Sequence, residues 1–291
     1  MHFVESKGIL SARNGMNIYR GCTHGCIYCD SRSRCYQMNH DFEDVEVKRN
    51  APELLEQKLS SKRKKCMIGT GAMCDPYMHC EAELGLMRRC LEVISRHGFG
   101  IAVQTKSSLI LRDINIIEEI NAKSKAVVQM TLTTADKNLC RVIEPAVCTT
   151  DERAKVLAEC RKRKIPTVVW LSPFLPFIND NEQNIRRLVE ICAQEKVRGI
   201  ICFGIGLTLR EGNREYFYSK LDQHFPGLKE KYIRTYGSSY EVTSPENDRL
   251  MRLLVSECQK AGIEWRPEKV FEYLNTLPEE KQNAAQGMFE F

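Results

Sequence analysis

The stretch Cys22-Thr23-His24-Gly25-Cys26-Ile27-Tyr28-Cys29 places three cysteines at C-x3-C-x2-C spacing, directly after a short apolar run. A loop this tight can bring three thiolates to one metal centre. Thiolates are the usual ligands of iron–sulfur clusters, but a four-iron cubane normally takes four protein ligands, so this loop would leave one iron open. A structural zinc site would instead be closed by a fourth protein ligand.

The candidates for that fourth ligand are poor. His24 lies between two of the cysteines and would have difficulty bending back onto the same ion, while Cys35 and His40 are loosely spaced. The sequence therefore predicts a [4Fe–4S] cluster held by Cys22, Cys26 and Cys29. A zinc knuckle, or three unrelated reduced cysteines, is the alternative.

Size and composition indicate a globular α/β protein. The chain has 291 residues, 43% of them apolar, and a formal charge of +5, a mild basic excess that does not name a substrate. Residues 1–13 lack the apolar core of a signal peptide, and no run reaches the roughly 18 apolar residues that span a bilayer. We expect a cytoplasmic protein without membrane contact. Its 14 cysteines are scattered, which is typical of reduced thiols.

Apolar, β-rich runs alternate with amphipathic helical windows from the cysteine loop to about residue 225. The expected strands are Met16–Tyr19, Cys66–Thr70, Gly100–Thr105, Ala126–Thr133, Thr167–Leu171 and Gly199–Ile205. The expected helices are 80–97, 111–122, 150–163, 181–195 and 213–224. This alternation predicts βαβ units with a parallel sheet, curled into a partial (β/α)6 barrel of the TIM type.

The last part of the chain has a different pattern. Turn-forming pairs interrupt residues 226–245, and a helix is expected at 246–261. We therefore expect a barrel core over residues 1–225 and a mainly helical extension over 226–291 that covers the barrel.

In such barrels function gathers at the carboxyl ends of the strands. The loop after the second strand, residues 69–81, carries Asp75 and Glu81, which could accept hydrogen bonds from a ligand amine. Glu81 is equally consistent with a carboxylate at a helix N-terminus. Lys106 follows the third strand and is well placed to meet a ligand carboxylate, with a surface lysine as the alternative.

Hydroxyl and charged residues follow the fourth strand. Thr131, Thr133 and Thr134 offer hydroxyls at its end. Glu144 and Arg153 come next, as a carboxylate and guanidinium pair that could support the pocket or form a structural salt bridge.

Taken together, these motifs resemble the radical S-adenosylmethionine (SAM) superfamily, and within it the spore photoproduct lyase-like group. The matching segments cover roughly residues 14–180 in consistent order: 17–22 with 24–26 and 28–29, 75–77 with Glu81, 105–107 with 112–113, and 144–145 with Arg153. The resemblance implies that SAM chelates the open iron and that the reduced cluster cleaves it to a 5′-deoxyadenosyl radical, which abstracts hydrogen from a substrate. It also implies a reductant such as flavodoxin or ferredoxin.

The resemblance also implies roles for single residues. Tyr28, Asp75, Lys106 and Thr133 would lie around SAM, with Thr131 and Thr134 as competitors for the last place. Glu144 and Arg153 would support the same pocket.

Two further residues would be catalytic. Cys74 and Tyr77 are the candidates, because a cysteine early in this loop returns a hydrogen atom in spore photoproduct lyases. Cys74 is shifted in register relative to the lyase pattern, so the alternative is a thiol packed under the loop. Cys80 could chemically serve as a hydrogen donor as well.

Three functional hypotheses follow. The first is a radical SAM enzyme acting on a nucleic-acid lesion or base, with DNA or RNA as substrate, as in DNA repair. Basic clusters at 62–65, 88–89 and 161–164, and aromatic residues interleaved with arginines in 210–240, suit this class, although solvated helix faces also explain them. The second is the same chemistry on a peptide, protein or small metabolite, and the third is a non-catalytic zinc- or nucleic-acid-binding protein.

Overall fold

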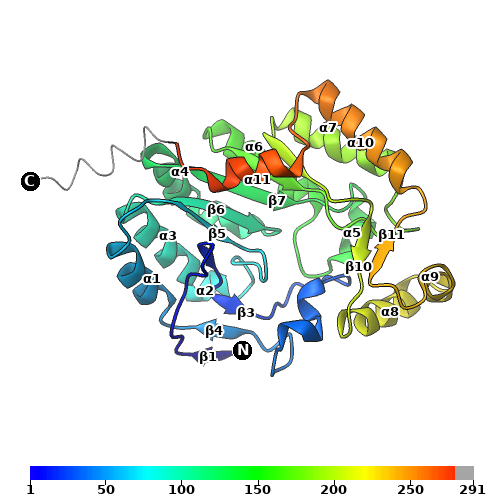
Figure 1. The fold of residues 1–291 in the computed structure, drawn as a ribbon, viewed down its shortest axis with the longest axis horizontal. Helices are drawn as coiled ribbons and strands as arrows, with labels where there is room; N and C mark the ends of the chain where they lie inside the picture. The colour runs from blue at the N-terminus through cyan, green and yellow to red at the C-terminus, as the bar shows by residue number, and fades with distance from the viewer. Residues whose placement is uncertain (279–291) are drawn as a thin grey trace, which may run out of the picture.

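A six-stranded parallel sheet organises the computed structural model, which describes residues 1–278 (Figure 1). Its strands follow one another in sequence order: β2 (Gly15–Met16), β5 (Met67–Thr70), β6 (Gly100–Thr105), β7 (Ala126–Thr131), β8 (Thr167–Trp170) and β9 (Gly199–Ile201). All neighbouring pairs are parallel, and the two edge strands, β2 and β9, do not pair with each other in this sheet order. The sheet is therefore a partial barrel, as the sequence predicts.

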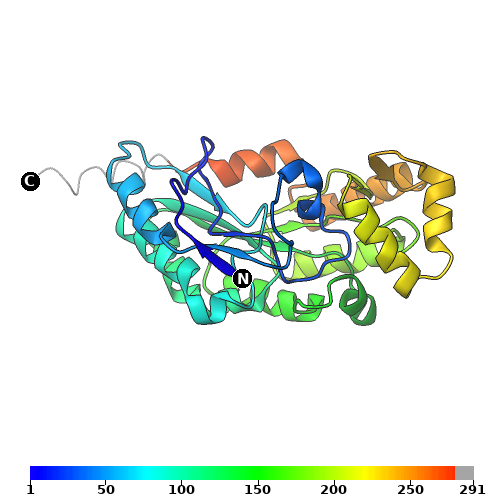
Figure 2. The ribbon, with the colours of Figure 1, turned by 90° about the horizontal axis from the view of Figure 1, so that it is seen from below.

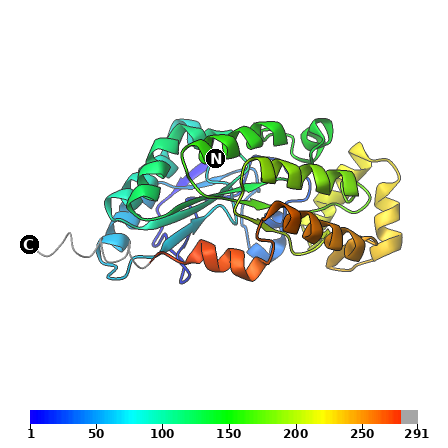
Figure 3. The same ribbon diagram turned by 90° about the horizontal axis from the view of Figure 1, so that it is seen from above.

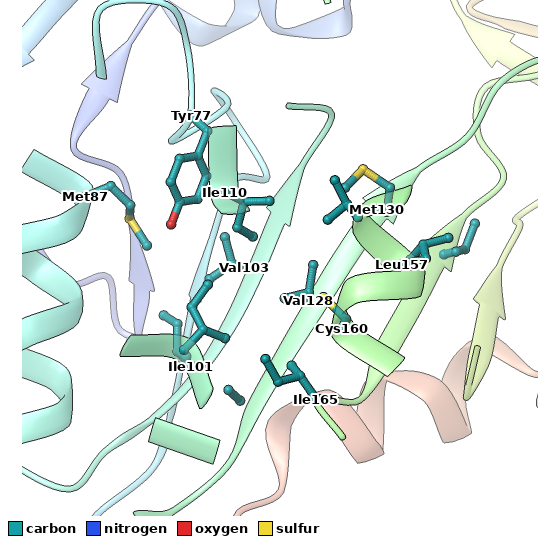
Figure 4. Packing of buried hydrophobic residues seen from close by; sticks show 14 of the residues in the cluster. Tyr77, Met87, Ile101, Val103, Ile110, Val128, Met130, Leu157, Cys160 and Ile165 are labelled. Atoms are coloured by element: carbon teal, nitrogen blue, oxygen red, sulfur yellow. The ribbon is translucent and has the colours of Figure 1, made fainter. Parts of the chain in front are cut away.

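Helices cross over between successive strands. They are α1 (Ala51–Ser60), α2 (Glu81–Leu84), α3 (Leu86–Arg96), α4 (Ile114–Lys123), α5 (Lys137–Ile143), α6 (Thr150–Lys162) and α7 (Glu182–Gln194), with short 3-10 turns at η1 (Asp30–Arg32), η2 (Arg34–Tyr36) and η3 (Ser108–Asp113). One face of the sheet packs on these helices, through residues such as Ile101, Val103, Val128 and Met130 with Leu157 of α6 (Figure 4). Burial on both faces explains why the strands are almost continuously apolar.

The opposite, concave face changes character along the strands. Near their N-terminal ends it carries Met67, Ala102, Val127, Val168 and Ile201, which pack on Val270, Leu274 and Leu277 of the C-terminal segment. Because side chains on one face recur every second residue, the same face continues with polar and aromatic residues toward the carboxyl ends. Helix α11 (Pro267–Asn275) thus covers the apolar half and leaves the other half free; Figure 3 shows it on the side of the sheet opposite the crossover helices.

The remaining elements flank the barrel. A three-stranded sheet is formed by β1 (His2–Val4), β4 (Glu46–Lys48) and β3 (Tyr19–Arg20), and a two-stranded one by β10 (Gly206–Thr208) and β11 (Glu241–Thr243). Between β10 and β11 lie α8 (Asn213–His224) and α9 (Leu228–Tyr236), which form one end of the molecule (Figure 2). Helix α10 (Asn247–Ala261) packs against α7.

Two expected elements are divided. The predicted first strand, 16–19, splits into β2 of the large sheet and β3 of the small one. The predicted helix 80–97 breaks at Gly85, which has φ +60° and separates α2 from α3. The other expected strands and helices are present, but the strand expected at 199–205 ends at Ile201 and the one expected at 126–133 ends at Thr131; the helix expected at 246–261 is α10.

The segment after residue 225 contacts the core at several places. β11 pairs with β10, and α11 contacts β5 and β9. The division of the chain at residue 225 stays a prediction, and its last residues, 279–291, lie outside the described part. None of the helices within residues 1–278 combines the length and apolarity that a bilayer span requires.

Candidate active site

The cysteine loop, residues 22–29, lies against the segment that follows α5. Ile27 N donates to Ile143 O at 3.0 Å, and Ala146 N donates to His24 O at 3.2 Å. These backbone bonds fix the loop from both sides of its middle cysteine. The sequence predicts that the cysteines share one loop, but it does not predict the contacts that stabilise the conformation of that loop.

The three thiols of Cys22, Cys26 and Cys29 fit a cluster better than a single zinc ion. The first two are buried and the third is partly exposed. Their sulfur atoms do not form a group of three within 4.8 Å of one another. A tetrahedral zinc with 2.3 Å bonds would need sulfurs about 3.8 Å apart. In a cubane each thiolate binds a different iron, so wider spacing is expected.

His24 does not complete the thiol set. Its Nδ1 faces Asp75, 3.6 Å from Oδ2, and its ring meets His79 edge-on at 5.8 Å. Burial lowers the pKa of His24 below its ordinary value, so the neutral imidazole is favoured. This geometry agrees with three cysteine ligands and one open position.

Asp75 ties the second-strand loop to the end of β6. Its Oδ1 accepts hydrogen bonds from Tyr77 N at 2.9 Å and Thr105 Oγ1 at 2.6 Å, and its Oδ2 accepts one from Lys106 N at 2.7 Å. The carboxylate accepts three hydrogen bonds from within the chain, and these connect the ends of two strands. Its predicted contact with SAM is not needed to explain its position.

Tyr28, Glu144 and Arg153 form a buried chain behind the cysteine loop. The Tyr28 hydroxyl donates to Glu144 Oε1, and Arg153 Nη2 donates to Glu144 Oε2 at 2.6 Å. Arg153 also donates to Thr131 O at 3.0 Å and Cys148 O at 2.9 Å. Burial opposes ionisation of Glu144, but Arg153 and Lys106 together lower its pKa below the ordinary value. Since Glu144 and Arg153 are fully buried, they support the loop from behind.

Lys106 acts electrostatically on Cys26 of the cysteine loop. Its Nζ lies 6.0 Å from the centre of the Tyr28 ring. Burial alone would lower the pKa of Lys106, but the negative charges of Cys26 and Glu144 raise it above the ordinary value. Lys106 is therefore a fixed ammonium group, suited to a ligand carboxylate.

A cavity of about 610 Å³ opens at the carboxyl ends of the strands. Tyr28, Cys29 and Lys106 contribute to its wall. The remaining wall comes from the loop after Cys29, from the strand ends and from the β10–β11 sheet with its flanking residues, and includes Asp30, Ser31, Gln104, Thr131, Trp170, Phe203, Thr208, Glu241 and Asn247. The cysteine loop and the strand ends thus meet around one space.

Thr131, not Thr133, lines this cavity. Strand β7 ends at Thr131, so the alternation that would carry Thr133 onto the same face stops there. Thr133 is instead buried, and its carbonyl oxygen accepts hydrogen bonds from Asn179 at 2.8 Å and Asn184 at 3.1 Å.

The two expected catalytic residues lie in the core. Cys74 is buried and donates to Tyr19 O at 2.7 Å, and burial raises the pKa of its thiol to about 12. The Tyr77 ring packs near Met87 and Ile110, and the whole residue is 1% exposed (Figure 4). Neither belongs to the described wall of the cavity, so the packed-thiol alternative describes Cys74 better.

Glu81 is structural as well. Its carboxylate accepts from Tyr19 Oη at 2.5 Å and from Arg112 Nη2 at 2.6 Å, while Arg112 also pairs with Asp113. This fully buried carboxylate joins β3, α2 and η3. These contacts explain the position of Glu81 by the packing of the barrel.

The basic clusters lie away from the cavity. Arg88 and Arg89 of α3 pair with carboxylates, and the chain at 161–164 forms ion pairs from Arg161, Lys162 and Arg163 at the end of α6. Residues 62–65 precede β5, at the N-terminal end of the sheet. None of these residues belongs to the described cavity wall.

An aromatic group at the cavity rim is absent from the sequence-based expectations. The Phe203 ring stacks on Phe271 at 6.1 Å and 17° and meets the Trp170 ring at 6.1 Å. Phe203 nevertheless stays 66% exposed. The sequence did contain a signal for this aromatic group. Side chains on one face of a strand recur every second residue, and this alternation, continued along β8 and β9, places Trp170 and Phe203 on the concave face.

Comparison with known families agrees with this geometry. The radical SAM superfamily matches residues 16–211, which is more than half of the chain. The chain therefore belongs to the radical SAM superfamily.

The chain is also similar to proteins that are described as uncharacterized. An uncharacterized protein of Mycobacterium tuberculosis is 28% identical over 241 residues, covering 80% of this chain and 70% of the relative. An uncharacterized protein of Methanocaldococcus jannaschii is 29% identical over 181 residues, covering 62% of this chain and 67% of the relative.

Among solved structures, a spore photoproduct lyase variant with bound AdoMet and dinucleoside spore photoproduct has a TM-score of 0.65. The match covers 87% of this chain and 75% of that one at 11% identity. A second structure, the lyase complexed with dinucleoside spore photoproduct, has a TM-score of 0.64 at 12% identity, over 85% and 74% of the two chains. These likenesses describe the fold.

Proposed function

We propose that this radical SAM enzyme removes a hydrogen atom from a nucleic-acid base or base lesion that enters the cavity at the carboxyl ends of the strands. Its cofactors are a [4Fe–4S] cluster and SAM, as in its superfamily. When bound, they supply the 5′-deoxyadenosyl radical, so the chemistry belongs to the cofactors and the chain supplies position, charge and exclusion of water.

Within this proposal Cys22, Cys26 and Cys29 hold the cluster. Cys29 is the thiol that also lines the cavity, so a cluster held by this loop would adjoin the same space. Lys106 lines that space as a protonated group, and we assign it to the carboxylate of SAM. Tyr28 connects the loop to Glu144, whose charge is balanced by Arg153.

The exposed ring of Phe203 carries the substrate assignment. One of its faces is stacked on Phe271, which fixes the ring at the cavity rim and leaves much of it open to solvent. A base can stack on such a ring whatever its sequence, with a contribution of about 1–3 kcal/mol. Because a duplex must first unstack a base at a cost of about a few kcal/mol, single strands should bind more tightly than duplexes.

One observation favours the second candidate, a small metabolite or peptide. The basic clusters that could neutralise phosphates are paired or lie at the opposite end of the strands. Binding that depends little on salt would support this alternative, since phosphate contacts make nucleic-acid affinity salt-dependent.

The radical activity is tested by anaerobic reconstitution with iron and sulfide, reduction with dithionite in the presence of SAM, and chromatography of 5′-deoxyadenosine. Cys26→Ala should lose the cluster absorption and the product. Cys35→Ala is the matched control, because that exposed cysteine lies outside the 22–29 loop, and it should retain both. Full SAM cleavage by Cys26→Ala would contradict the assignment of the loop.

The substrate class is tested with Phe203→Ala and a fluorescent single-stranded oligonucleotide. Loss of about 1–3 kcal/mol of stacking predicts binding weaker by roughly 5- to 150-fold, with unchanged affinity for SAM. If SAM affinity falls and oligonucleotide binding does not, the ring belongs to the cofactor and the base assignment is wrong. Wild-type protein that binds no oligonucleotide would favour the small-molecule alternative.

A further inference from the structure

Three side chains of types that commonly bind metal ions meet at the small β1–β4–β3 sheet. They are His2 on β1, and His40 and Asp44 on the loop that leads to β4. Each offers one ligand atom, and these atoms lie within 4.8 Å of one another. Among residues 1–278 this is the one such group of histidine, cysteine or acidic residues, and none of its members lines the cavity described above.

The three side chains are already oriented toward one another. His2 Nδ1 donates to Asp44 Oδ2 at 2.9 Å, and the rings of His2 and His40 meet edge-on at 4.9 Å. The other carboxylate oxygen, Oδ1, faces the Met1 amine at 2.9 Å. One carboxylate oxygen and two imidazoles therefore converge.

His40 has the arrangement of a metal ligand. Its Nδ1 lies 3.0 Å from Asp41 O, and since a carbonyl oxygen only accepts, Nδ1 carries the proton. In the neutral ring Nε2 then holds a lone pair, and this atom is buried without a hydrogen-bond partner in the described chain. Metal-binding histidines typically donate their second nitrogen to a carbonyl or carboxylate in this way.

We propose that His2, His40 and Asp44 bind one divalent metal ion of the zinc type, with water as the fourth ligand. Two imidazoles and a carboxylate suit zinc and its neighbours better than calcium or magnesium, which prefer oxygen ligands. The ion would take the place of the proton between His2 Nδ1 and Asp44: in the neutral ring this proton moves to Nε2, and in the charged ring one proton leaves to solvent.

The position gives the metal a structural role. It would connect β1 to the loop of residues 37–45, and this loop contains Phe42, whose carbonyl oxygen accepts a hydrogen bond from Cys22 N at 3.0 Å. A metal bound here would therefore stiffen the support beneath the first cysteine of the 22–29 loop without belonging to the cluster.

The test is a zinc titration of the cluster-loaded full chain by calorimetry, with iron and zinc measured after desalting. We expect one equivalent of zinc per chain. His40→Ala and the isosteric Asp44→Asn should each weaken binding by about 100-fold or more, because loss of a direct ligand should exceed the 10- to 100-fold cost of losing an outer partner. Iron content should not change, and His224→Ala, at an exposed histidine on α8, should bind zinc like the wild type.

Cobalt absorption separates this site from the cysteines. Cobalt bound by nitrogen and oxygen should show weak d–d bands without thiolate charge-transfer bands, and these should disappear in Asp44→Asn. Zinc binding equal in wild type, His40→Ala and Asp44→Asn would overturn the proposal. So would charge-transfer bands that persist in both variants, because the metal would then be on thiolates.

Discussion

Gly71 allows the second-strand loop to approach the end of β6 more closely than any other residue could. Its φ is +97°, and a Cβ added there would lie 1.9 Å from Gln104 O. A side chain would therefore meet backbone, which cannot rotate away. Since Gln104 lines the cavity, this close approach also sets the shape of the candidate active site.

We expect Gly71→Ala to lower the free energy of unfolding by about 3 kcal/mol or more, from the strained φ together with the overlap. Gly69→Ala is the matched control, because its added Cβ meets nothing within 4 Å. Chemical denaturation of both variants checks the prediction. Equal stability of the two variants would mean that the loop can move away from Gln104.

The pair of Glu144 and Arg153 gives a second prediction. Arg153→Met would leave a buried carboxylate without its partner, which costs about 3–5 kcal/mol. Replacing both partners, in Glu144→Gln with Arg153→Met, should recover a large part of that loss, because no unpaired charge remains buried. Denaturation of the two single variants and the double variant measures the coupling; strict additivity would show that the pair does not act as a unit.

Single residues show how far the sequence could be interpreted. The spacing of the three cysteines was sufficient to place them in one loop, since that information is local. Whether Cys74 and Thr133 reach the cavity depends on the direction of the chain where a strand ends. Contacts with Tyr19, Asn179 and other residues distant in the sequence determine that direction. Local patterns identify the loop, but they do not decide which side chain reaches the cavity.

At the scale of elements, Lys125, directly before β7, connects α11 to the sheet. Its Nζ donates to the carbonyl oxygens of Tyr273, within the last turn of α11, and of Thr276, just beyond it. A cation is favourable at a helix C-terminus, because free carbonyls lie there. Burial, with a contribution from Arg198, nevertheless lowers the pKa of Lys125 to about 8.

This shift predicts a pH dependence. Between about pH 8 and the unfolded value near 10.5, the unfolded chain holds more protons at Lys125 than the folded chain, so this residue's contribution to stability rises with pH. The difference in stability between wild type and Lys125→Met should therefore increase from pH 7.5 to 9.5. Because both proteins contain the same other buried groups, the pH dependence that those groups add to stability cancels in the comparison. A stability difference that stays constant between these pH values would refute the lowered pKa of Lys125.

The elements themselves were predictable where periodicity was strong. Apolar runs such as 100–105 and 126–131 identify β6 and β7, because buried parallel strands are apolar on both faces. The pairing of β1, β4 and β3, and that of β10 with β11, joins short segments far apart in the chain. Two or three residues carry too little pattern to predict a strand, so these sheets appear only in the structure.

At the scale of the whole molecule, the concave face of the large sheet is bordered by two elements, α11 and the β10–β11 sheet. Helix α11 covers its apolar half, and the two-stranded β10–β11 sheet borders the open half that forms the cavity. β11 and α11 both come from the segment after residue 225, and Leu207 of β10 packs with Val242 of β11 in one core cluster. The extension thus builds part of the cavity wall as well as part of the core.

This arrangement predicts that a chain ending at residue 225 does not fold by itself. Truncation would uncover Met67, Ala102, Val127, Val168 and Ile201 together and remove the partner of β10. An apolar surface of this kind drives aggregation, so we expect an insoluble product or one that binds a hydrophobic dye strongly and takes up little iron. A chain ending at residue 278 is the control and should be soluble, because it retains α11. A soluble, cluster-loaded protein of residues 1–225 would instead establish the barrel core as an independent domain, with the extension acting only at the substrate side of the cavity.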